Sequence, residues 1–247
     1  MPKDTPSELV ITQQFCGPPN SGNGGYVSGL LAKPFDGVAT AVLRAPPPLN
    51  TPLFLKPFGD GVRMENADGD LIGEGRPGDA SDIPTPPPPP TMAEAVAAAP
   101  GFPGLHRPFH PICFSCGDKL EEGYGLRVFT GQVEGREPGF VAGPWTPNPV
   151  FADAEGLVPV EVLWAALDCA GSVAWVVTEG GGGLLGTMTC EILRRPAVGE
   201  PCIVTAWPIE QQGRRRISGT ALWTADGQLL ARSHQVWIGR PPVAQAA

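Results

Sequence analysis

The sequence predicts an α+β protein in which two antiparallel sheets each wrap around a central helix. Three observations lead to this prediction. Two flanks of the chain carry similar landmarks in one order, a proline-rich stretch separates them, and each flank has one helix-sized apolar run followed by strand-like segments. One helix cannot cover both faces of a sheet, so the economical arrangement is an antiparallel sheet wrapped around the helix. Two such copies can also pair edge to edge.

The order of the landmarks indicates an internal duplication. Each flank has an apolar helix-sized run, a strand that ends in Leu-Arg, a proline turn, a strand after a proline, and a strand entered through Ala-Asp-Gly. Ala-Asp-Gly alone is a common hairpin turn, so the argument depends on the shared order. The corresponding residues are Leu43-Arg44 and Leu193-Arg194, Pro52 and Pro201, and Ala67 to Gly69 and Ala225 to Gly227.

The elements follow in chain order. In the first flank, the glycine-rich NSGNGG precedes the helical run YVSGLLA, and strand-like segments follow it. In the second flank, VEVLWAALDCAGSVAWVV is the helix, and Pro159 before it suits a first helical turn. The segments PCIVTAWPI, RRISGTALWTA and GQLLARSHQVWI have the alternating or continuous apolar character of strands.

The prolines are concentrated between the flanks. The stretch PTPPPPPTMAEAVAAAPGFPGLHRPFHP combines a polyproline II spacer with a short alanine-rich helical patch. We therefore predict a first unit over residues 1–80, a proline-rich crossover linker over 81–110, and a second unit over 111–240. The six tryptophans all lie beyond the spacer.

Composition excludes several classes of function. The chain has 247 residues, a formal charge of −8 and a pI near 4.9, which argues against a surface for duplex nucleic acid. The N-terminus has no apolar signal region, and no uninterrupted apolar run approaches 18 residues, so we expect neither export nor a membrane span. We predict a cytoplasmic protein whose six cysteines are thiols rather than disulfides.

The chain contains three motifs of note, which are Asn23-Gly24-Gly25, Leu167-Asp168-Cys169-Ala170-Gly171 and Cys113-Phe114-Ser115-Cys116-Gly117. Together they resemble those of hotdog-fold acyl-CoA thioesterases of the phenylacetate-pathway type, in a double-hotdog arrangement that covers nearly the whole chain. Asn23-Gly24-Gly25 looks like the His-Gly-Gly at the start of the central helix of that family. Leu167-Asp168-Cys169-Ala170-Gly171 is similar to the Leu-x-Asp-x-Ala-Gly segment further along the helix. Cys113-Phe114-Ser115-Cys116-Gly117, with Gly125-Leu126-Arg127, resembles the lead-in before the first strand of some members.

The resemblance implies a use for the bare backbone at Gly24 and Gly25. A helix N-terminus has unpaired N–H groups and a partial positive charge. Without side chains there, a thioester carbonyl can approach those donors, which would stabilise the oxyanion of an acyl-transfer intermediate. The alternative is a flexible loop with a glycine entry to an ordinary helix. Asn20 and Asn23 would line the carbonyl end of the site, and Asn23 stands where the family pattern has histidine.

The acid required for hydrolysis is expected on the other helix. The family pattern places it seven residues after the second glycine, which is Ala32 in the first copy and Asp168 in the second. One copy therefore keeps the donors and the other keeps the acid, and the family geometry implies one composite site. Ser172, one turn after Asp168, would hold water or orient the carboxylate. Asp36 is the competing acid, although Pro34 disturbs its helix.

Two further patterns complete the prediction. The spacing His110-x2-Cys113-x2-Cys116 suits a metal, but only one CxxC is present and no fourth ligand is evident, so we predict no metal and no cofactor. The arginine run is either a solvated strand end or a clamp for the phosphates of coenzyme A. Its members are Arg214, Arg215 and Arg216.

The predicted function is that of an acyl-CoA thioesterase-like hydrolase, with acyl-CoA as its small-molecule partner. The alternative is a catalytically silent acyl-CoA or acyl-carrier-binding protein. A dehydratase is disfavoured because no Asp-x4-His pair occurs at the helix start. We expect no nucleic-acid or membrane partner, and a homodimer is left open.

Overall fold

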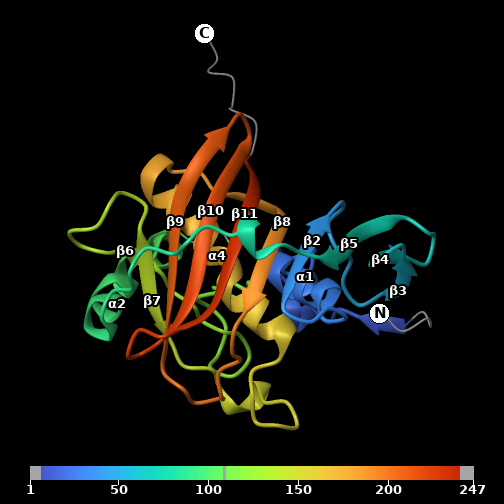
Figure 1. Cartoon of the computed structure of the whole chain (residues 1–247), viewed down its shortest axis with the longest axis horizontal. Coiled ribbons are helices and arrows are strands. Elements are labelled where there is room, and N and C mark those ends of the chain that lie inside the picture. The colour runs from blue at the N-terminus through green and yellow to red at the C-terminus, as the bar shows by residue number, and fades with distance from the viewer. Residues whose placement is uncertain (1–6, 108–109, 240–247) are drawn as a thin grey trace.

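The protein is built on one antiparallel sheet of eleven strands in the order β1-β3-β4-β5-β2-β8-β11-β10-β9-β7-β6. The structure, a computed structural model, describes residues 7–107 and 110–239. Figure 1 shows the sheet with the helices α1 and α4 beside it. The strands are β1 (Ser7–Val10), β2 (Val38–Leu43), β3 (Pro52–Phe58), β4 (Gly61–Asn66), β5 (Leu71–Pro77), β6 (Gly131–Gln132), β7 (Val141–Trp145), β8 (Gly183–Ile192), β9 (Cys202–Gln212), β10 (Arg215–Thr224) and β11 (Leu229–Gly239).

The strand order is mirrored about the pair β2 and β8. On one side the order outward is β2-β5-β4-β3, and on the other it is β8-β11-β10-β9. Equivalent hairpin turns lie between β4 and β5 and between β10 and β11. In these turns Gly69 and Gly227 have φ angles of 85° and 87°, a left-handed conformation that favours glycine. The two halves of the chain thus have the same path.

The sequence predicts two sheets, whereas the structure has a single one. β2 and β8 pair antiparallel from Val38 opposite Glu191 to Val42 opposite Thr187. At the centre of this seam, Thr40 and Thr189 are directly opposite each other, and their Oγ1 atoms are 2.9 Å apart. Without this pairing, each of the two strands would leave a row of unpaired backbone N–H and C=O groups at a sheet edge. The pairing therefore supplies hydrogen-bond partners to both halves of the chain.

Two helices of unequal length contact the sheet and each other. α1 (Gly24–Ala32) packs against β2 and β5, and α4 (Val160–Glu179) packs against β9, β10 and β11. Gly25 lies against Asp168 and Trp164, and Gly29 lies against Glu161, so the two helices run antiparallel. At the far end of this contact, Lys33 Nζ and Glu161 Oε1 form an ion pair at 3.0 Å.

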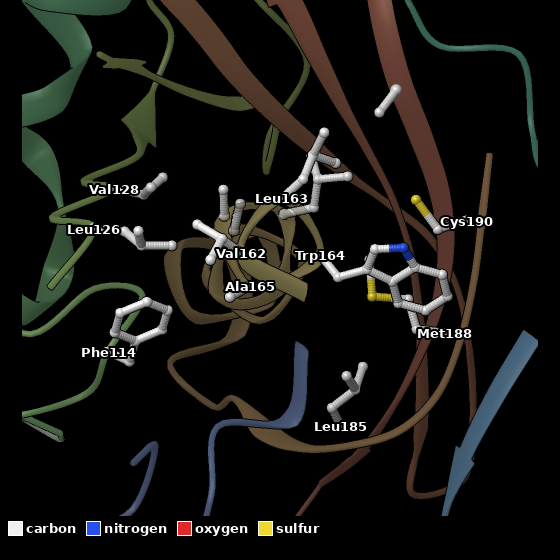
Figure 2. Packing of buried hydrophobic residues seen from close by; sticks show 14 of the residues in the cluster. Phe114, Leu126, Val128, Val162, Leu163, Trp164, Ala165, Leu185, Met188 and Cys190 are labelled. Carbon is white, nitrogen blue, oxygen red and sulfur yellow. The ribbon is translucent and has the colours of Figure 1, made fainter. Parts of the chain in front are cut away.

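α4 is the central helix of the larger half. It ends at Glu179, and Gly180 after it, with a φ of 70°, provides a left-handed cap. Figure 2 looks along the helix and shows Val162 directed toward Leu126 and Val128, with Trp164 directed toward Met188 and Cys190. By length and composition alone α4 could cross a membrane, but 67% of its most apolar window is buried inside the protein. The core helix of a globular domain meets the same criterion.

The segment after β5 crosses the sheet and leads to two short helices, α2 (Met92–Ala98) and α3 (Pro103–His106). It runs in front of the long strands in Figure 1. Arg232 of β11 donates to the carbonyl oxygens of Ile83 and Ala80 and so ties the crossing segment to the sheet. α2 contributes Ala95 and Ala98 to a second apolar cluster, which also includes Val133, Phe140, Ala142, Ile203, Ala221 and Trp223.

Gly29 gives a prediction about the contact between the helices. A Cβ atom at this position would lie 2.4 Å from Cα of Glu161, which is backbone and cannot rotate away. We expect Gly29→Ala to lower the free energy of unfolding by about 1–3 kcal/mol, the usual cost of overpacking. Chemical denaturation measures the effect. The control is Gly101→Ala, because a Cβ there would have only one neighbour, at 3.9 Å. Equal stability of the two variants would contradict the close contact.

Candidate active site

The site begins at the first turn of α1, where Asn23 has two roles. Its Oδ1 accepts a hydrogen bond from the Tyr26 N–H at 2.9 Å and thereby caps the helix. Its Nδ2 donates to Oδ2 of Asp168 on α4 at 2.8 Å. An amide carries both an acceptor and a donor, so one buried side chain can satisfy α1 and hold the carboxylate. Asn23 is 1% exposed.

Gly25 is the closest approach of α1 to this carboxylate. A Cβ at residue 25 would lie 2.5 Å from Cβ of Asp168 and 2.6 Å from the carbonyl oxygen of Trp164. The Gly25 N–H also hydrogen-bonds with the Asp168 carboxylate. The absence of a side chain at residue 25 therefore has a packing reason, which is independent of any role toward a ligand.

Asp168 is a buried carboxyl group, 3% exposed. Burial raises its pKa to about 7, and the nearby Cys113 adds to the rise, while hydrogen bonds from Gly25 and Asn23 oppose it. Among the described residues, Oδ1 has no hydrogen-bond partner. No lysine or arginine within residues 7–107 and 110–239 forms an ion pair with Asp168. A carboxyl group that titrates near neutrality is suited to take up a proton as a general base.

Three cysteines lie beside Asp168. The Sγ atoms of Cys113, Cys116 and Cys169 are all within 4.8 Å of one another, and Cys113 Sγ is 3.7 Å from Asn23 Nδ2. Hydrogen bonds from Cys116 and then Cys169 hold the pKa of Cys113 well below its usual range. The same bonds to Cys113 raise the pKa values of Cys116 and Cys169. The cluster is therefore able to stabilise a thiolate on Cys113.

The duplicated fold has a second, equivalent position for such a site, and its residues are different. There the start of α4 meets the end of α1, and Glu161 pairs with Lys33. Ala32, at the acid position of this copy, is buried and apolar. The structure therefore brings donors and acid together only where α1 begins and α4 passes it, within the residues it describes.

Other predicted site residues make no hydrogen bond to Asp168 in the described part of the chain. Ser172 Oγ accepts a hydrogen bond from the Gly183 N–H at 3.3 Å, so the side chain serves the loop between α4 and β8. Asn20 is exposed in the turn before α1, and Asp36 is exposed in the turn after it.

A cleft of about 370 Å³ opens beside the start of α1. β2 pairs with β8 only from Thr187 onward, so residues 184–186 of β8 diverge from the first half and form one wall. Gly24 lies in the floor, and Leu184 and Ile238 present exposed apolar side chains. The cleft is in the size range of small-molecule sites. Its lining residues also include Leu43, Arg44, Pro46, Pro47 and Leu185.

The three arginines have different surroundings. Arg216 donates to the carbonyl oxygens of Gly181 and Gly182 and pairs with Glu179, so it secures the end of α4. Arg214 Nε donates to the Gly239 carbonyl oxygen at 3.1 Å. Arg215 is exposed and lies directly opposite Ile238 in the sheet. Opposite residues share a sheet face, so Arg215 is next to an apolar residue of the cleft.

Sequence reasoning missed two parts of this site. It did not include Cys169 in a cluster, because 53 residues separate it from Cys116 and only the fold brings them together. It also missed Leu185, which a Cβ at Gly24 would meet at 2.9 Å. The signal available for the cysteines was the pattern Cys-x2-Cys-Gly together with a cysteine directly after the candidate acid.

Comparison with known proteins identifies the fold. No protein family model matches the sequence, and no curated protein does. A hot dog fold protein of unknown function from Alicyclobacillus acidocaldarius matches 98% of this chain and 95% of its own, with a TM-score of 0.64 and 13% identity. The tesB protein of Mycobacterium avium subspecies paratuberculosis matches 96% and 93%, with a TM-score of 0.62 and 13% identity. An acyl-CoA thioesterase II from Mycobacterium marinum matches 92% of each chain, with a TM-score of 0.59 and 16% identity. The chain therefore has the hotdog fold.

Proposed function

We propose that this hotdog-fold chain is a double-hotdog thioester hydrolase that acts on acyl-CoA. The observation that carries the proposal is the buried Asp168 carboxyl group against the first turn of α1, where Asn23 and Gly25 contact it. The matched proteins support the proposal, since two of them are named as a tesB protein and an acyl-CoA thioesterase. The composite site would be formed by one helix from each half.

The proposed chemistry uses both helices. Asp168 removes a proton from water, whose oxygen attacks the thioester carbon; the C–S bond then breaks, and the thiolate leaves and takes up a proton. Alternatively the carboxylate attacks the thioester carbon, the C–S bond breaks and the thiolate leaves and takes up a proton, and water then hydrolyses the resulting anhydride. At the start of α1, Asn23 already accepts from the Tyr26 N–H. The Gly24 N–H, which has no acceptor within the helix, is left to stabilise the oxyanion.

The cleft beside Gly24 fits the acyl part or the pantetheine arm of such a substrate. The apolar side chains of Leu184 and Ile238 are exposed in the cleft, and a bound apolar chain would cover them and remove them from water. Gly24 joins the cleft floor to the first turn of α1, so a chain bound there would bring a carbonyl group toward the helix start. The expected substrate class is a thioester with an apolar acyl chain.

A panel of acyl-CoA thioesters of different chain length tests the proposal. We expect the protein to catalyse the release of free coenzyme A from at least one member of the panel. A thiol reagent follows this release. The cysteines of the protein also react with such a reagent, so product acid is measured in parallel by mass spectrometry. Absence of turnover across the panel, with a folded protein, would contradict the proposal.

Arg215 is the arginine we expect to contact the phosphates of coenzyme A. Arg215→Gln should raise KM for acyl-CoA about threefold to tenfold and leave kcat unchanged, because the nucleotide lies far from the reacting carbon. The same acyl group on pantetheine, which lacks those phosphates, should show no change. Arg76→Gln, at an exposed arginine outside the cleft, is the matched control. An equal rise of KM for both thioesters would exclude a phosphate contact at Arg215.

One observation favours a second candidate, a catalytically silent acyl-CoA or acyl-carrier-binding protein. Asp168 and Asn23 are 3% and 1% exposed, and Gly25 is also buried, so the carboxylate is closed off from the cleft. In this case a thioester would bind in the cleft without reaching Asp168. Saturable binding of acyl-CoA together with no product acid over the whole panel would make this second function the better account.

A further inference from the structure

The three-cysteine cluster is formed by two distant segments of the chain. Cys113 and Cys116 belong to the turn 111–117, and Cys169 belongs to the middle of α4. The Sγ atoms of Cys113 and Cys169 are 3.6 Å apart, and Cys116 contacts both through its thiol. The three sulfur atoms thus form a small triangle inside the protein.

The turn that carries two of these cysteines is tightly built. The Gly117 N–H donates to the Cys113 carbonyl oxygen at 2.7 Å. A Cβ at residue 117 would lie within 2.7 Å of backbone atoms of Cys113 and Pro111, so only glycine fits. The backbone N–H groups of Ser115 and Cys116 donate to the Cys113 sulfur. The turn therefore directs both side chains to one point and stabilises a sulfur anion there.

Neighbouring packing holds this turn against α1. The Phe114 N–H donates to the Cys16 carbonyl oxygen at 2.7 Å. The Phe114 ring makes edge contacts with Phe15 and Tyr26, with centroids 4.9 Å and 5.7 Å apart. The sulfur atoms are consequently fixed by backbone and aromatic contacts, which is the condition for a preformed ligand set.

The dimensions of the triangle fit a tetrahedral metal ion. Zinc binds thiolates at about 2.3 Å, and two ligands of a tetrahedron are then about 3.8 Å apart. The measured separation of 3.6 Å between Cys113 and Cys169 agrees with this value. We propose that Cys113, Cys116 and Cys169 together bind one zinc ion.

The side chain of Asn23 connects the cysteine triangle to Asp168, which is not itself a member of the ligand cluster. Asn23 Nδ2 lies 2.8 Å from Asp168 Oδ2 and 3.7 Å from Cys113 Sγ, so one amide joins the carboxylate to the cluster. Asp168 Oδ1 is buried and lacks a partner among the described residues. A divalent cation bound to the three sulfur atoms would favour the charged form of this buried carboxyl group.

The remaining cysteines differ in their surroundings. Cys16 Sγ is directed to the Ile112 carbonyl oxygen at 3.1 Å. Cys190 is buried in β8 and Cys202 in β9, and neither belongs to the cluster. Cys190 is therefore a suitable control, since it is a buried thiol like Cys113 and Cys116 and lies outside the cluster.

The test is the metal content of the full chain, purified without chelators under reducing conditions. Elemental mass spectrometry should find about one zinc ion per chain. Cys113→Ser, Cys116→Ser and Cys169→Ser should each lose most of it, whereas Cys190→Ala should keep it. This readout does not depend on hydrolysis, so it is independent of the proposed thioesterase activity.

A second measurement keeps the test valid if a serine variant does not fold. Wild-type protein stripped of zinc and loaded with Co²⁺ should show the intense visible absorption of tetrahedral cobalt bound to thiolates. Three results would overturn the proposal: wild type that takes up neither metal, equal zinc loss in Cys190→Ala, or a disulfide within the cluster of the isolated protein. The last would appear as a mass two units lower than that of the reduced chain.

Discussion

Asp168→Asn is expected to reduce thioester hydrolysis by about 10²–10⁴-fold, the contribution of a general base, while the fold is retained. Asparagine has the size of aspartate, and its oxygen can still accept the hydrogen bond that Asn23 Nδ2 now donates to Oδ2. An amide is neither a competent base nor a nucleophile for the thioester carbon.

The matched control for this variant is Asp36→Asn. Asp36 is the competing acid of the first half, and it is exposed in the turn after α1. Its replacement should leave hydrolysis close to wild type. Steady-state product formation measures both variants, and binding is followed through intrinsic fluorescence, since Trp164 and Trp175 lie on either side of Asp168 in α4. If Asp168→Asn hydrolyses like wild type and Asp36→Asn does not, the acid belongs to the first half and our pairing of the two helices is reversed.

Gly25→Ala should have the second large effect, on stability and on hydrolysis together. The added methyl group would lie 2.5 Å from Asp168 Cβ and 2.6 Å from the Trp164 carbonyl oxygen, so α1 must move away from α4. Overpacking costs about 1–3 kcal/mol. The movement would also carry the helix start away from the carboxylate, and we expect hydrolysis to fall by about 10²-fold or more, as it does when an oxyanion donor is lost.

Gly29→Ala separates the two causes. It also forces α1 from α4, but at Glu161, and Gly29 lies one helical turn after Gly25 in α1. The two variants should lose similar stability in chemical denaturation, whereas Gly25→Ala should lose far more activity per folded molecule. Equal activity of the two folded variants would mean that the glycine at residue 25 serves packing alone.

Local rules in the sequence were sufficient for the elements that carry the candidate site. The glycine-rich stretch before the apolar run YVSGLLA predicted a helix start at Asn23-Gly24-Gly25, and in the structure α1 begins at Gly24 with Asn23 as its cap. The apolar run around Asp168 predicted the long helix, and Ala-Asp-Gly predicted the turns in which Gly69 and Gly227 have positive φ. Capping, turn formation and periodicity depend on a few neighbouring residues, so these features are readable without a fold.

Contacts between distant residues were decided only by the tertiary structure. β2 and β8 pair into one sheet because each would otherwise present an unpaired edge. Arg216 is drawn to the end of α4, and Ser172 bonds to Gly183, because buried polar groups take the partners that packing brings within reach. Cys169 meets Cys113 for the same reason. The sequence by itself therefore determined which helix begins with bare backbone and which one contains the carboxylate. The tertiary structure decided what each of these residues touches, since burial and close packing act between segments far apart in the chain.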